Sequence, residues 1–321
     1  MAYDVSALTN YTREYEGKLV IKSMFDGKTA QVVSSLGNLQ TGIKTSEQIN
    51  ILDNGVHFAA DSCGFSSSGS TTFTQRAITV GSIKVNQSFC VQDLEDKWTQ
   101  KELPIGNNYN KLPFEQYISE LYAGQIAQKL EAALWKGNTS SGNFDYKHFD
   151  GLIKLIDAAS GVTQGNTTSI TTATGITASN AHTIFQNMYA AAPAAILGKS
   201  DLRFFCGWDV FRLLKLNLTN LNLFQYNGED TNGELTLPGT DVKVIAVHGL
   251  NTNVADGVTA NNYRIFLMRV SNIFLGTDMQ NEEEKYEIFF AKEADEMRFV
   301  ARFKMGIQVA FPNEIVKFTL V

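Results

Sequence analysis

Apolar and polar residues alternate along two stretches that flank a segment rich in glycine and serine. The first stretch covers 48–60, the second covers 72–80, and the polar segment between them is 63–70. Alternation with a period of two predicts strands, and the short polar segment predicts a hairpin. Two strands of about ten residues would project roughly 30 Å, and an isolated two-stranded ribbon is only marginally stable in water. We therefore expect another molecule to cover this arm, which points to assembly.

The clearest helical pattern runs from Pro113 to Lys136. Apolar side chains recur there at three- and four-residue steps, which predicts one broad apolar face. Pro113 suits the first helical position, and Gly137 suits the position after the last turn. About 24 residues give a helix of roughly 36 Å, about twice the usual length, so we interpret it as a central structural element. Its expected core residues are Tyr117, Leu121, Tyr122 and Leu130.

Helical patterns and strand patterns are interleaved after this helix, which predicts an α+β layer architecture. Residues 1–38 are mixed and polar with short apolar patches, and we expect them to form an arm that finds its partners elsewhere. Helices are expected over 178–192 and from Asp209 or just before it. Strands are expected over 203–206, 241–247, 263–270, 287–290, 297–303 and 306–311.

Composition and charge narrow the functional classes. The 321 residues carry a formal net charge of −6, which disfavours general binding to a nucleic-acid backbone because such binding needs clustered Lys and Arg. Cys63, Cys90 and Cys206 are widely spaced, without a C-x-x-C pair, and are interpreted as reduced thiols. The first ten residues have no secretory pattern, and no window is apolar enough to span a membrane. We expect the chain to be made and used in a cytoplasm.

Sequence motifs for catalysis are not found. There is no phosphate-binding G-x-x-x-x-G-K-[ST], no H-E-x-x-H and no G-x-S-x-G, and the four histidines have no second ligand at metal-binding spacing. The acidic residues between 282 and 296 are best interpreted as solvated turns. We therefore expect no catalytic residue, no cofactor and no metal site. An intracellular hydrolase that uses acidic residues near the 286–298 turn stays open as an alternative of a different class.

Several motifs, taken in their order, resemble the tailed-phage major capsid proteins of the HK97 fold. The long helix ends in Ala-Ala-Leu-Trp-Lys-Gly-Asn at 132–138, and Phe-Asp-Gly-Leu follows at 149–152. A strand–turn–helix motif is similar over 202–214, where Cys-Gly-Trp replaces the usual Met-Asn-Pro. Further similar segments are Leu-Pro-Gly-Thr-Asp-Val-Lys-Val at 237–244 and the closing stretch at 297–317.

The resemblance implies an α+β fold with four parts. These are an N-arm at 1–44, an extended E-loop hairpin at 45–88, a peripheral (P) domain at 89–149 and 286–321, and an axial (A) domain at 150–285. The E-loop would lie over a neighbouring subunit. The residues expected to contact that subunit are Ile51, Phe58, Phe65, Phe73 and Arg76.

The function that the resemblance implies is structural. The chain would assemble with itself into pentamers and hexamers of an icosahedral shell around double-stranded DNA, which it would contact non-specifically. Scaffolding, portal and auxiliary capsid proteins are further expected partners, and no membrane is expected to take part. The chain would be located in the virion capsid, which would be assembled in the host bacterial cytoplasm. Some members cross-link the E-loop through a lysine, but residues 46–82 contain none, so we expect no cross-link. An encapsulin-like nanocompartment shell is the nearest alternative, and a phage tail or adaptor subunit is another.

Overall fold

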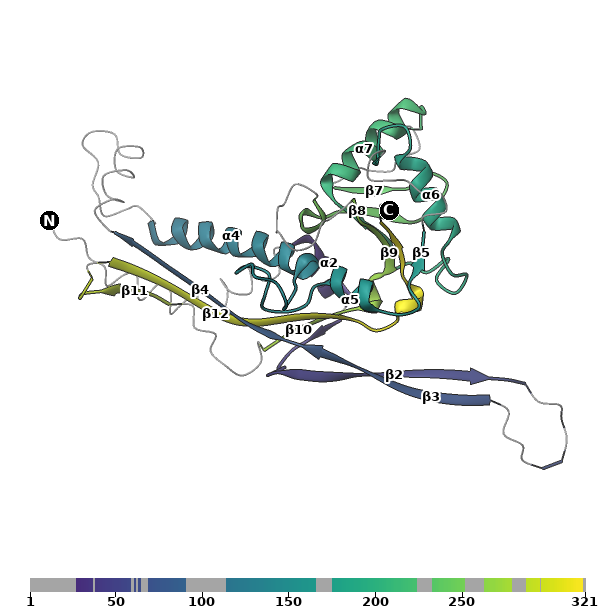
Figure 1. Cartoon of the computed structure of the whole chain (residues 1–321), viewed down its shortest axis with the longest axis horizontal. Coiled ribbons are helices and arrows are strands. Elements are labelled where there is room, and N and C mark those ends of the chain that lie inside the picture. The colour runs from purple at the N-terminus through teal and green to yellow at the C-terminus, as the bar shows by residue number, and fades with distance from the viewer. Residues whose placement is uncertain are drawn as a thin grey trace.

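The computed structural model of the chain describes residues 27–36, 38–58, 61, 63–64, 69–90, 114–165, 175–223, 233–251, 263–278, 287–294 and 296–319. Figure 1 shows an elongated molecule in which a long helix, α4 (Phe114–Lys136), lies along a twisted sheet. A hairpin of β2 (Ser46–Val56) and β3 (Gly69–Thr79) leaves this sheet in the opposite direction. A second sheet with its helices stands above the middle of the molecule.

The first sheet has five strands and carries the long helix. Its order is β1 (Leu39–Gln40), β10 (Ile273–Thr277), β12 (Glu296–Val309) and β11 (Glu287–Ala291), with β4 (Gly81–Cys90) paired to β12. Side chains of β12 alternate, so that Met297 and Phe299 are buried while Arg298 and Arg302 are exposed. Helix α4 covers the buried face, where Tyr122 packs against Phe299 with ring centroids 4.7 Å apart.

Strand β12 is one continuous strand of 14 residues, whereas the sequence predicted two strands, at 297–303 and 306–311. Gly306 continues the strand because it pairs with Gly276 of β10. A Cβ atom at Gly306 would lie 2.2 Å from the carbonyl oxygen of Thr79, so the glycine allows the end of β3 to approach closely. Gly306, which the sequence placed at the start of a second strand, is therefore a packing residue inside one strand.

Helix α4 begins and ends close to the predicted positions. Among its described side chains, Ile126, Leu130 and Leu134 are buried at helical spacing in the main core. After Lys136 the chain turns at Gly137, whose N–H donates to the Ala133 carbonyl at 2.8 Å. The following loop leads to α5 (Leu152–Ala158), which packs into the same core.

The second sheet has six strands and its own core. Its order is β5 (Thr163–Gln164), β13 (Val316–Phe318), β9 (Ile265–Arg269), β6 (Leu202–Cys206), β8 (Lys243–Ala246) and β7 (Glu234–Thr236). Helices α6 (Ala181–Ala190) and α7 (Trp208–Asn220) pack on it. Short 3₁₀ turns lie at His248–Leu250, Val270–Asn272 and Pro312–Glu314.

The strand pairing does not follow the domain boundaries expected from the sequence, which placed an A domain at 150–285 and part of the P domain at 286–321. Strand β10 (Ile273–Thr277) belongs to the first sheet, although it falls inside the expected A domain. Strand β13 (Val316–Phe318) pairs with β9 in the second sheet, although it falls inside the expected P domain. The chain thus crosses to the first sheet before residue 286 and returns to the second sheet at its end.

The segment from 27 to 43 packs into the body, whereas the sequence predicted that residues 1–38 form an arm with partners elsewhere. Helix α2 (Lys28–Ser35) places Ala30 and Val33 in the core beside α4, and β1 pairs in parallel with β10. Ile43 follows into the core at the base of the hairpin. The prediction is wrong for these residues, and the part of it that concerns residues 1–26 lies outside the described residues.

Candidate assembly site

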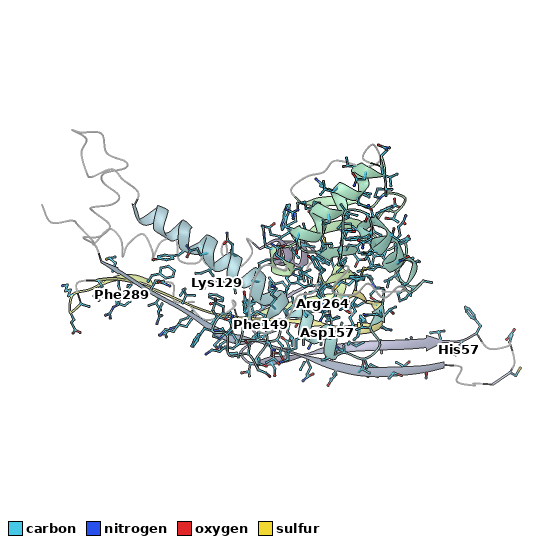
Figure 2. All side chains as sticks on the ribbon, turned by 45° about the horizontal axis from the view of Figure 1, so that its top comes forward. His57, Lys129, Phe149, Asp157, Arg264 and Phe289 are labelled. Carbon is cyan, nitrogen blue, oxygen red and sulfur yellow. The ribbon has the colours of Figure 1, made fainter. Side chains whose placement is uncertain are left out.

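The β2–β3 hairpin is a regular antiparallel ladder. The pairing runs without interruption from Ser46 opposite Thr79 to Val56 opposite Gly69. The paired strands end at Thr79, and residues 81–90 pair with β12 instead, so the hairpin is shorter than the expected segment 45–88. Figure 2 shows the hairpin reaching away from the body, with His57 near its outer end.

One face of the hairpin is turned toward the body near its base. Ile49, Ile51 and Ile78 lie on this face and are buried together with Ile43, Val80 and Ala310. From β3, the Arg76 Nη1 atom donates to the Val309 carbonyl at 3.2 Å. The Gln308 Nε2 atom donates in return to the Ala77 carbonyl at 2.7 Å. The base of the hairpin is therefore anchored to the end of β12.

The opposite face carries an apolar cross-strand pair. Leu52 lies directly opposite Phe73, and their side chains are 56% and 77% exposed. Cross-strand hydrogen bonds flank this pair on the same face: Gln75 Nε2 donates to Asn50 Oδ1 at 2.8 Å, and Thr71 Oγ1 donates to Asn54 Oδ1 at 2.9 Å. Because these polar side chains satisfy each other, the face presents an apolar centre without charge at its flanks.

The five hairpin residues expected to contact a neighbour fall into three groups. Phe58 and Phe73 are exposed, at 103% and 77%, as a contact with another chain requires. Ile51 and Arg76 are used within the chain, because Ile51 is buried at the base and Arg76 binds Val309. Phe65 lies outside the described residues. Sequence alternation alone did not distinguish the body-facing residues from the free ones.

The four expected core residues of the long helix, Tyr117, Leu121, Tyr122 and Leu130, all lie on α4. Leu130 is buried, and Tyr122 is partly buried against Phe299. Tyr117 and Leu121 lie in the first half of α4, and their side chains are outside the described set. The part of α4 from Tyr122 onward therefore packs on the first sheet.

A buried carboxylate, which the sequence analysis missed, joins α4 to α2. Glu131 is 4% exposed and accepts hydrogen bonds from Thr29, from the N–H at 3.1 Å and from Oγ1 at 2.5 Å. Trp135 Nε1 donates to the same Thr29 Oγ1 at 2.8 Å. Burial raises the pKa of Glu131 because it disfavours the charged form, and the Thr29 hydrogen bonds oppose this shift. No sequence signal marks Glu131, since a glutamate inside a helix is typical of a solvated face.

The geometry gives the hydrolase alternative no support among the described residues. At the turn between β11 and β12, Glu293 is exposed and Glu296 lies 3.8 Å from Arg298 in a partly exposed ion pair. Within the described ranges, no three His, Cys, Asp or Glu side chains are grouped so that they could hold a metal ion. Across these same ranges, no helix is long and apolar enough to cross a membrane.

No protein-family model and no curated protein sequence matches the chain. Solved structures are similar to it along most of its length. A chain of Gordonia phage Cozz is 12% identical with a TM-score of 0.56, and the match covers 90% of this chain and 86% of that one. A chain from the procapsid of satellite phage P4, which includes the size determination protein Sid, is 10% identical with a TM-score of 0.59, covering 100% and 91%. A chain from the capsid of an empty GTA particle is 12% identical with a TM-score of 0.55, covering 92% and 90%.

These structures share their fold with the chain. The mixed α+β architecture predicted from the sequence resemblance is confirmed at the level of fold, because chains from a phage procapsid and a particle capsid match at least 90% of this chain.

Proposed function

We propose that the chain is a tailed-phage major capsid protein, a non-enzymatic subunit that assembles with itself into a closed icosahedral shell. The observation that carries this proposal is the outer half of the β2–β3 hairpin. It presents Leu52 and Phe73 to solvent on a two-stranded ribbon, and no further strand of the described chain pairs with either of its edges. The fold shared with chains of a procapsid and a capsid supports the same function.

The subunit would have four parts, with boundaries adjusted to the strand pairing. The E-loop is the β2–β3 hairpin at 46–79. Of the N-arm expected at 1–44, only the part before helix α2 keeps that assignment, and it lies outside the described residues. The P domain is the first sheet with α4, and the A domain is the second sheet with α6 and α7. Five or six A domains would meet at each capsomer axis.

Such a subunit functions through the arrangement of its contacts with neighbouring copies. The hairpin of one copy lies over the next copy in the ring, and this contact is heterologous because the two surfaces differ. Obligate contacts of this kind typically bury roughly 2,000–5,000 Å² in total. Rings of five and six then close into a container, and many modest contacts acting together make it stable.

The proposed content of the shell is double-stranded DNA. A net charge of −6 fits a wall that encloses DNA and contacts it non-specifically, without gripping its backbone. Scaffolding, portal and auxiliary capsid proteins would be further partners during assembly, which would take place in the host bacterial cytoplasm.

Negative-stain electron microscopy tests the proposal directly. The protein is expressed alone and separated by size-exclusion chromatography, with a variant lacking residues 56–72 prepared in parallel. We expect closed shells or capsomer rings from the full chain and a folded, unassembled subunit from the deletion variant. Normal shells from the deletion variant would contradict a role in assembly for the outer end of the hairpin, residues 56–72, and open tubes from the full chain would indicate a tail protein.

The content of purified shells separates the two shell functions. Nuclease-resistant DNA in particles from infected cells supports the capsid, whereas a protein cargo without DNA would indicate an encapsulin-like nanocompartment. A monomer that stays unassembled when candidate scaffolding protein is added would contradict both.

A further inference from the structure

The direction of the hairpin depends on contacts at its base. Beyond the pair Ile51–Thr74, described side chains of both strands are exposed, so the body does not support the outer part. Ser70, near the outer end of β3, lies roughly 30 Å along the strand from Thr79. A turn of about 10° at the base would therefore move Ser70 by roughly 5 Å, which is enough to misplace a contact.

Lys304 joins three segments at this base. It lies on β12, and its Nζ atom donates to the Lys44 carbonyl oxygen at 3.1 Å, where the chain enters the hairpin. The same Nζ atom lies 2.9 Å from Asp278 Oδ2, immediately after β10. One ammonium group thus connects β12, the end of β10 and the backbone that leads into β2.

The carboxylate beside Lys304 has little water to stabilise it. Asp278 is 4% exposed, and its Oδ1 atom is buried without a hydrogen-bond partner among the described residues. The side chain of Lys304 is 27% exposed and therefore mostly shielded from water as well. A buried carboxylate needs a charged or hydrogen-bonding partner, so Asp278 holds the lysine in one place and Lys304 in turn holds the Lys44 carbonyl.

Further hydrogen bonds surround Lys304 at the junction between the hairpin and the first sheet. Ile43 donates its N–H to the Thr277 carbonyl at 3.1 Å, and Val80 donates to the Thr45 carbonyl at 3.0 Å. Thr277 Oγ1 donates to the Lys304 carbonyl at 3.1 Å. The two strands of the hairpin therefore meet the first sheet around the point that Lys304 occupies.

We propose that Lys304, held by Asp278, is a positioning residue that sets the angle at which the β2–β3 hairpin leaves the body. This inference rests on the proposed shell function for its consequence, because a hairpin set at the wrong angle misses the neighbouring subunit. The angle itself is a property of the single subunit and is measurable without assembly.

The test measures the distance between two spin labels in unassembled subunits, or in shells diluted with unlabelled subunits. Labels are attached to Ser70→Cys on the hairpin and Ser140→Cys on the body, both exposed positions, in a Cys63→Ser/Cys90→Ser background. Cys206 is buried and stays unlabelled. The key variant is Lys304→Met with Asp278→Asn, because the lysine change alone would leave a buried charge without its partner.

We expect a narrow distance distribution for the parent and for the control Lys84→Met, which removes an exposed lysine from neighbouring β4. Asp278→Asn keeps Lys304 but weakens the hold on it, so its distribution is expected to lie between those of the parent and the double variant. The double variant is expected to fold, with a distribution that is broader and shifted by up to about 5 Å, the displacement of a turn of about 10° over the hairpin. A double variant that matches the parent would overturn the proposal, and so would a Lys84→Met variant as broad as the double variant.

Electron microscopy of the same variants separates this inference from the proposed function. The double variant is expected to give fewer closed shells and more irregular ones than the parent. If the parent itself forms no shells, the shell function fails while the distance measurement still decides the role of Lys304.

Discussion

Leu52 and Phe73 face each other across the β2–β3 hairpin, in register, and both side chains are more than half exposed. This pair lies just beyond Ile51, the last buried residue of β2. The hairpin therefore changes at this point from a ribbon supported by its own body to a ribbon with an apolar face that nothing in the described chain covers. Covering such a face with a second subunit contributes about 25 cal/mol for each Å² of apolar surface removed from water.

Replacing Phe73 with Asp tests this face. The substitution removes exposed apolar surface, so the free energy of unfolding is expected to change by less than about 0.5 kcal/mol in urea denaturation. Assembly is expected to fail, because a carboxylate would be buried against the neighbouring subunit. Electron microscopy and light scattering measure the loss of shells.

Phe144 provides the matched control for Phe73. It is an equally exposed phenylalanine, at 78%, and lies in the loop after α4. Phe144→Asp is expected to leave shells intact. Normal shells from Phe73→Asp would show that the outer face of the hairpin is not an assembly contact.

Substitutions at Leu130 test whether α4 supplies the core that covers the first sheet. Its side chain is 4% exposed in the main core, so Leu130→Ala is expected to lower the free energy of unfolding by about 2–5 kcal/mol. Leu130→Asp is expected to abolish folding, because it buries a charge. Lys129→Ala, at the neighbouring exposed position, is expected to change stability by less than about 1 kcal/mol. Equal effects of the two alanine variants would contradict this packing.

Glu131 makes stability depend on pH in a defined direction. Burial raises its pKa in the folded chain, so the charged carboxylate costs free energy at neutral pH, and this cost disappears as the pH falls through the folded pKa toward the unfolded value. Glu131→Gln keeps an acceptor for Thr29 without the charge. The variant is expected to be more stable than the parent at pH 7, with a difference that shrinks as the pH is lowered.

Urea denaturation of parent and Glu131→Gln at several pH values provides the measurement. Thr29→Val serves as the companion variant, because it removes the hydroxyl that binds both Glu131 and Trp135. It is expected to destabilise the chain at every pH. A Glu131→Gln variant less stable than the parent at pH 7 would show that the hydrogen bonds outweigh the cost of burial.

Two glycines give opposite predictions for the same substitution. A Cβ atom at Gly81 would lie 1.9 Å from the His148 carbonyl oxygen, so Gly81→Ala is expected to destabilise the fold by roughly 1–3 kcal/mol. Gly124 lies inside α4 with open space around its Cβ position, so Gly124→Ala is expected to stabilise it by about 0.5–1 kcal/mol. Thermal denaturation compares them, and a neutral Gly81→Ala variant would contradict the close approach of β4 to the 148–149 backbone.

The sequence predicted the elements whose periodicity is strong. Helix α4 was placed within one residue of its ends, because its apolar stripe is long and a proline and a glycine flank it. The hairpin was predicted from alternation and from the polar segment between its arms. The fold followed from the order of short motifs, none of which is specific alone.

Contacts between distant residues could not be predicted in the same way. Alternation in β2 does not tell which residues meet the body, since Ile51 and Leu52 differ only in the face to which they point. The sequence divided β12 into two strands because it does not show that Gly306 packs against the Thr79 carbonyl, 227 positions earlier in the chain. The sequence did not reveal the buried Glu131, because its partner Thr29 comes from a segment that the sequence assigned to an arm with partners elsewhere.

A cryo-electron microscopy reconstruction of the assembled particles tests the central proposal most directly. We predict a closed shell of pentamers and hexamers in which residues 52–73 of each copy lie over a neighbouring subunit, with Leu52 and Phe73 buried at the contact. A particle in which these two side chains remain exposed to solvent, or in which each hairpin folds back onto its own subunit, would contradict the assignment of the hairpin as the assembly arm.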